Sequence, residues 1–128
     1  MSLFVKIMLF VVSAVFVLIG CFGVFQPTQF AATLGFELPS PDSVGNIRAM
    51  IGAHYIAMGL VCGYAALRTL PLLVFPIGVI EAVMVLARLL SAVNGEFTSA
   101  TVGPTVIELT ASTLLLSISL PHLTGRKA

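Results

Sequence analysis

The stretch that decides the fold is Leu72–Val93, LLVFPIGVIEAVMVLARLLSAV, in which only Glu81 and Arg88 are ionisable. About 20 consecutive apolar residues are enough for a helix to cross a bilayer core of roughly 30 Å. Stretches of the same character fill most of the rest of the chain: Ile7–Phe25, Ile47–Leu67 and Pro104–Leu120. We therefore predict four membrane spans, at about residues 4–25, 44–67, 72–93 and 102–120.

The overall composition supports a membrane protein. The 128 residues are 59% hydrophobic and 9% charged, with a mean hydropathy of +1.13, which leaves too few polar side chains to coat a soluble protein. Inside a bilayer only helices or closed barrels pair every backbone group, and unbroken apolar runs exclude the alternating pattern of a barrel. We predict an all-α fold, a four-helix bundle in one domain over residues 1–128. The net charge of +1 offers no basic surface, so we expect no nucleic-acid partner.

The charges outside the spans are distributed unequally between the two sides of the expected bundle. The basic residues belong to the two ends of the chain and the middle connection: Lys6, Arg68, Arg126 and Lys127. The acidic residues belong to the first and third connections: Glu37, Asp42 and Glu96. Positively charged loops remain in the cytoplasm, which predicts that both termini are cytoplasmic.

Local signals predict where the helices begin and end. A short interfacial helix is expected around Thr28–Leu34, closed by Gly35. Ser40 is a suitable N-cap for the second span, with Pro41 at its first position. The tight link at residues 68–71 predicts that spans two and three form an antiparallel hairpin.

The first span has a second interpretation. Leu18–Cys21, LIGC, matches the lipobox of bacterial lipoproteins, in which Cys21 would be lipidated after cleavage. The apolar run continues to Phe25, beyond that site, which favours a retained first span.

Two stripes of residues indicate how the spans pack. Small residues share one face of span two, and we assign the glycines among them to helix packing: Gly45, Ala49, Gly52, Gly59, Gly63 and Ala66. Such a face lets another helix approach closely, either within the monomer or in a homodimer. Polar residues share one face of span four and should point inward: Thr101, Thr105, Glu108, Ser112 and Ser119.

Five ionisable residues lie within the spans and form our candidate polar cluster: Arg48, His54, Glu81, Arg88 and Glu108. At 1.5 Å per residue, Arg48, Arg88 and Glu108 fall roughly 6–9 Å below the outer boundary. His54 and Glu81 lie about 15–18 Å deep. We expect Arg88 to pair with Glu108, with Arg48 reaching the same network, and Glu81 to pair with His54 directly or through water.

The cluster has a structural and a functional interpretation. Buried ion pairs can fix the order of the helices, or arginines can reach the outer head groups. Intramembrane ionisable residues also mark functional sites, here a polar pocket for a head group, a quinone-like ring or a proton relay. No catalytic, metal or cofactor motif is present. Cys21 and Cys62 differ by about 20 Å in depth, too far apart for a disulfide.

Several short motifs carry a resemblance that covers nearly the whole chain. They are Arg48–Gly52 at the start of span two, Ala87–Ser91 and Asn94–Gly95 at the end of span three, and Glu108 in span four. The chain resembles an uncharacterised family of small four-span bacterial membrane proteins, similar in architecture to DoxX-like proteins, although Asn94 stands where such proteins often have an acid. The resemblance implies a multi-pass protein of the bacterial inner (cytoplasmic) membrane and no particular activity.

Two hypotheses for function follow. The first is a non-enzymatic accessory protein that packs against another membrane protein, or its own copy, through the small-residue face. The second is a binder, transporter or membrane enzyme for a lipid- or quinone-sized molecule that uses the charged cluster. Membrane lipids are expected partners in both.

Overall fold

The computed structural model describes residues 1–125, and within them the chain is all-α. Four helical segments are long and apolar enough to cross a membrane, namely Leu3–Phe25, Pro41–Arg68, Pro71–Val93 and Ser99–Leu123. These bounds lie within a few residues of those expected from hydropathy. Arg126 and Lys127, which contributed to the expected orientation, lie outside the described residues.

The segments divide into the following elements. The first span is α1 (Leu3–Phe25), followed by the short α2 (Pro27–Thr33). The second is continuous through α3 (Pro41–Asn46), a π-helical segment η1 (Ile47–Ala53) and α4 (His54–Arg68). The third comprises a 3₁₀ turn, η2 (Pro71–Val74), and α5 (Phe75–Val93), and the fourth is α6 (Ser99–Leu123).

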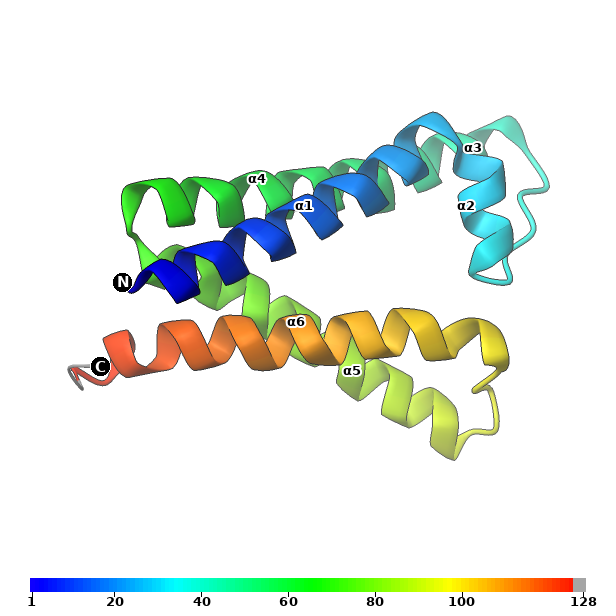
Figure 1. The fold of residues 1–128 in the computed structure, drawn as a ribbon. Coiled ribbons are helices and arrows are strands. Elements are labelled where there is room, and N and C mark those ends of the chain that lie inside the picture. Colours follow the sequence, from blue (N-terminus) through cyan, green and yellow to red (C-terminus); the bar gives the residue numbers. More distant parts are fainter. Residues whose placement is uncertain (126–128) are drawn as a thin grey trace.

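The four long segments pack as two pairs that meet near one end. α1 lies along η1 and α4, whereas α5 lies along α6 (Figure 1). The pairs touch mainly where η2 contacts α4 and where α6 contacts α1, and they separate toward the opposite end. The prediction that spans two and three form an antiparallel hairpin is therefore wrong beyond the connecting turn, because α4 packs on α1 and α5 packs on α6.

Glycines explain why α4 takes α1 as its neighbour. A Cβ on Gly52 would come within 2.8 Å of the Val24 backbone nitrogen, and one on Gly59 within 2.8 Å of the Ser13 carbonyl oxygen. Gly63 faces the same Ser13. The Ser13 hydroxyl also donates a hydrogen bond to the Gly59 carbonyl at 2.7 Å. The stripe on span two is thus an interface inside the monomer.

Gly45 is an exception to this assignment. A Cβ there would meet no atom within 4 Å, because α3 extends past the part of the second span that α1 covers. The stripe also has two partners on α1 that were not expected from the sequence. Gly20 and Gly23 both lie against Gly52, so small residues on both helices bring the two backbones together.

The expected caps are present. Ser40 accepts a hydrogen bond from the Ser43 backbone N–H, and Pro41 begins the helix. Gly35 and Gly95 have φ of +77° and +75° where α2 and α5 end, a conformation that glycine adopts without strain. Pro104 lies inside α6, in its early turns.

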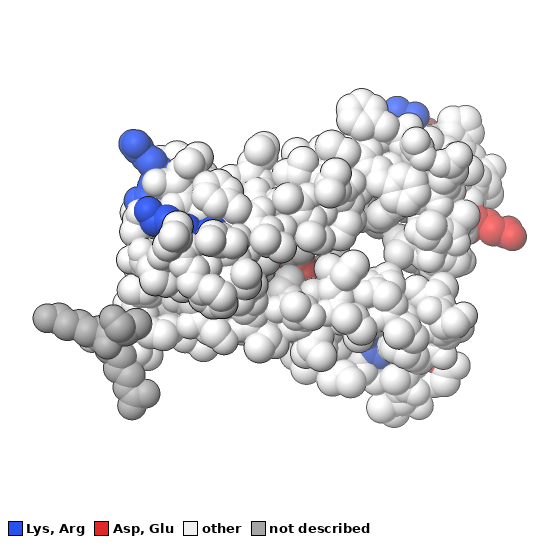
Figure 2. Space-filling view, viewed as in Figure 1, with Lys and Arg blue, Asp and Glu red and all other residues white. Residues whose placement is uncertain are grey.

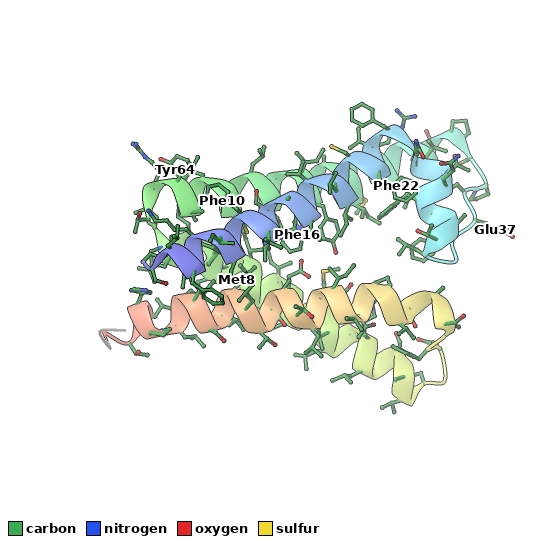
Figure 3. All side chains as sticks on the ribbon, in the orientation of Figure 1. Met8, Phe10, Phe16, Phe22, Glu37 and Tyr64 are labelled. Carbon is green, nitrogen blue, oxygen red and sulfur yellow. The ribbon has the colours of Figure 1, made fainter. Side chains whose placement is uncertain are left out.

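The two ends of the molecule differ in charge. The N-terminus and the end of α6 lie at the same end, together with the α4–η2 turn (Figure 1). Lys and Arg side chains gather at that end (Figure 2). At the opposite end an acidic side chain projects outward, although Lys or Arg atoms are also visible there (Figure 2). Glu37 lies in the loop at this opposite end and points away from the helices (Figure 3).

Candidate functional site

A cavity of about 580 Å³ lies where the two helix pairs separate. Its walls come from α1, α2, η1 and α4 on one side and from α5 and α6 on the other. In the space-filling view the two layers part here, and acidic atoms are visible between them (Figure 2). The volume is in the range of pockets that hold small molecules, about 300–1,000 Å³.

The lining of the cavity is mostly apolar with a few polar groups. The large apolar side chains are Ile19, Phe30, Leu34, Phe36, Met50, Ile51, Met84 and Ile107. The polar ones are Thr33, His54, Tyr55, Arg88, Ser99, Thr101 and Glu108. This composition suits a ligand with a large apolar body and a small polar part.

An ion pair between Arg88 and Glu108 closes one wall. The Arg88 Nε donates to Oε2 of Glu108 at 3.2 Å, and Nη2 donates to Oε1 at 3.0 Å. This two-bond geometry is the strongest form of a guanidinium–carboxylate contact. The Glu108 side chain is 2% exposed and that of Arg88 is 27% exposed, so the arginine is the member of the pair that faces open space.

Glu81 lies one turn deeper than the cavity. It precedes Met84 by three positions and Arg88 by seven, which places it on the same face of α5 as these two lining residues. The residue is 0% exposed. Neither carboxyl oxygen has a hydrogen-bond partner among residues 1–125.

Two expected contacts of the cluster are missing. His54 lines the cavity and is exposed, and it forms no direct hydrogen bond or ion pair with Glu81. Arg48 is exposed on η1 and does not join the Arg88–Glu108 pair in the described part of the chain. The expectation of these contacts assumed regular α-helix throughout span two, whereas the π-helical turns of η1 change the direction in which later side chains point.

The polar stripe of α6 contributes less than its spacing suggested. The hydroxyls of Thr105, Ser112 and Ser119 donate to carbonyl oxygens of their own helix. Thr101 and Thr98 form a capping box at the start of α6. Glu108 is the member of the stripe that reaches another helix.

Sequence reasoning missed Tyr55, a buried residue in the cavity wall. Its ring packs edge-on against Phe16 of α1, with ring centroids 5.5 Å apart, and Phe16 points from α1 toward the interior (Figure 3). The position of Tyr55 next to His54 gave no sign of a functional role in the sequence, because an aromatic residue in an apolar span usually serves ordinary packing. Phe30 and Phe36, also in the wall, come from α2 and the loop after it.

Metal ligation is not supported by the described residues. Residues 1–125 contain no group of three or more His, Cys, Asp and Glu side chains that could hold a metal ion. Cys21 and Cys62 are both free thiols. The site therefore consists of an apolar cavity, one ion pair and a buried carboxyl group.

Comparison with known proteins identifies the family. The sequence matches the family described as "Domain of unknown function (DUF4345)" over residues 4–119. The chain belongs to this family. No curated protein and no solved structure is similar enough to the chain to match it. The match includes every residue that lines the cavity, so the cavity lies within the DUF4345 domain.

The polar side chains of the cavity in this DUF4345 domain lie on both of its walls. The two strongest polar groups, Arg88 and Glu108, already satisfy each other. Tyr55 and His54 stand on the opposite wall, on α4. The walls thus offer polar contacts to a head group, while the remaining surface accepts an apolar chain or ring.

Proposed function

We propose that this DUF4345 protein binds an amphiphilic small molecule, of lipid or quinone size, in the cavity between its two helix pairs. The observation that carries this proposal is the cavity itself, in which an apolar lining surrounds His54, Tyr55 and the Arg88–Glu108 pair. An apolar body would be favoured by burial, and the polar wall would fix the orientation of the head group. Binding is the step that a carrier, a transporter and a membrane enzyme share.

The packing of the small-residue stripe removes the surface that the accessory-protein hypothesis assigned to a partner. That hypothesis gave the glycine face of span two to a partner protein. Gly52, Gly59 and Gly63 instead lie against α1, so the face is occupied within the monomer. Cleavage before Cys21 would likewise remove residues 1–20 of the chain, including Ser13 and Gly20, which pack against Gly59 and Gly52.

The setting that we propose is the bacterial cytoplasmic membrane, with both termini in the cytoplasm. The support is the position of Lys6 and Arg68 at the end of the molecule that holds the N-terminus. The cavity lies toward the other end, beside α2 and the first turn of α6. A ligand would then bind within the outer half of the bilayer.

Native mass spectrometry tests the proposal. Ala100 lines the cavity in the first turn of α6, and Ala100→Phe would fill space that the ligand needs. Ala57 is exposed on α4 and lines no part of this cavity, so Ala57→Phe is the matched control. We expect gently extracted wild-type protein and Ala57→Phe to retain a small molecule of defined mass, and Ala100→Phe to lose it.

Two results would contradict the proposal. Wild-type protein that carries no small molecule under conditions that preserve annular lipids would leave the cavity without a ligand. Equal retention by Ala100→Phe would place the bound molecule on the outer surface instead.

A further inference from the structure

The buried carboxyl group of Glu81 has a consequence for the chemistry of the site. It lies at mid-span on α5, is 0% exposed, and neither of its oxygens has a partner among residues 1–125. A buried polar group normally has a hydrogen-bond partner, and a buried charge normally has a counter-charge. Glu81 therefore departs from both rules at the level just below the cavity.

Titratable groups approach Glu81 from three helices. Glu108 on α6 and Tyr55 and Cys62 on α4 lie within range of direct electrostatic interaction with it. Arg88 lies two turns along its own helix, and His54 faces the cavity from α4. The titratable residues of α1, Lys6 and Cys21, lie near the two ends of that helix.

The balance of charge decides the state of Glu81. Among residues 1–125, the guanidinium group at this level belongs to Arg88, and both carboxylate oxygens of Glu108 already accept its hydrogen bonds. An ionised Glu81 would therefore be a second carboxylate close to Glu108 without a cation of its own, a combination that both desolvation and like-charge repulsion disfavour. Uptake of a proton removes both penalties.

We propose that Glu81 is a proton-binding site inside the membrane. We further propose that protonated Glu81, together with the Arg88–Glu108 pair, makes the cavity selective for amphiphiles with an uncharged polar head group. With Glu81 protonated, the charges of Arg88 and Glu108 cancel, and these three side chains together carry no net charge. If Glu81 releases its proton, the same three side chains carry one net negative charge and favour a cationic head group. The head-group preference rests on the proposed function, whereas the proton site does not.

Infrared spectroscopy tests the proton site without any ligand. At neutral pH, wild-type protein in nanodiscs should show the carbonyl stretch of a protonated carboxyl group, and Glu81→Gln should lack it. Glu37→Gln, at an exposed loop position, should retain it. Absence of the band from wild-type protein, or its persistence in Glu81→Gln, would overturn the proposal.

Photolabelling tests the head-group preference. Three probes share one diazirine-bearing alkyl chain and differ in the head group: a monoacylglycerol, a fatty acid and a quaternary alkylammonium. At neutral pH the monoacylglycerol should label cavity residues several-fold more than either charged probe. Labelling by the alkylammonium should rise with pH more steeply in wild-type protein than in Glu81→Gln, which retains His54 but lacks the carboxyl group.

The two tests fail in distinguishable ways. A charged probe that labels the cavity as strongly as the monoacylglycerol at neutral pH would overturn the head-group preference. Labelling of the cavity by none of the probes, with the infrared band present, would overturn the proposed function and support the proton site.

Discussion

Arg88 and Glu108 form an ion pair in which the two side chains differ in burial. The carboxylate is almost completely buried, whereas about a quarter of the arginine side chain is exposed beside the cavity. Removal of the arginine would leave a buried charge without a partner, whereas removal of the carboxylate would leave a cation that can turn toward the cavity. The two single substitutions should therefore differ in cost.

We expect Arg88→Met to lower the free energy of unfolding by about 3–5 kcal/mol, the usual cost of breaking a buried pair. Glu108→Gln should cost less, because the amide oxygen can still accept one hydrogen bond from Arg88. The double variant Arg88→Met with Glu108→Leu should recover much of the loss. Unfolding in detergent micelles measures all three, with exposed Arg48→Met as a control that should have little effect. Strictly additive losses in the double variant would contradict the coupling of the pair.

At the scale of residues, the sequence predicted the contact that depends only on the depth of two side chains in the membrane. Arg88 and Glu108 lie at similar depths on adjacent spans, and the structure brings them together. The contact expected between His54 and Glu81 depended on the direction of each side chain. That direction follows η1, and a π-helical segment has no hydropathy signal by which it could be recognised.

At the scale of helices, close approach of backbones decides which pairs form. α1 meets the second span through glycines on both helices. A Cβ added to Gly78 of α5 would lie 3.1 Å from the Leu116 backbone nitrogen of α6. Hydropathy locates each span within a few residues, but it carries no information about which span lies beside which. For that reason the span bounds were predictable, whereas the separation of α4 from α5 was not.

Alanine substitutions in the second span test this packing. Gly52→Ala and Gly59→Ala place a Cβ against α1 backbone atoms at 2.8 Å, and such overpacking typically costs about 1–3 kcal/mol. Gly45→Ala is the matched control, since it adds the same atom in open space of the same span. It should be neutral, or stabilising by up to about 1 kcal/mol through helix propensity. Equal effects of all three on the thermal unfolding midpoint would mean that α1 does not pack on this face.

At the scale of the whole molecule, the charge difference between the two ends should set its orientation. Reporter fusions after Thr69 should give a cytoplasmic signal, because a basic residue such as Arg68 favours the cytoplasmic side for its turn. Fusions near Pro39 and Glu96 should give a signal from the opposite side. A cytoplasmic signal from either of these two sites would contradict the orientation and move the cavity to the inner half of the bilayer.

The central claim is that the space between the two helix pairs is a binding site, and a crystal structure grown in a lipidic phase tests it most directly. We expect the two helix pairs to stay apart in such crystals. An elongated non-protein density should lie between α4 and α6, with its polar end near Tyr55 and Arg88. Closure of the two pairs onto each other, with Met84 and Ile107 filling the space, would contradict the claim.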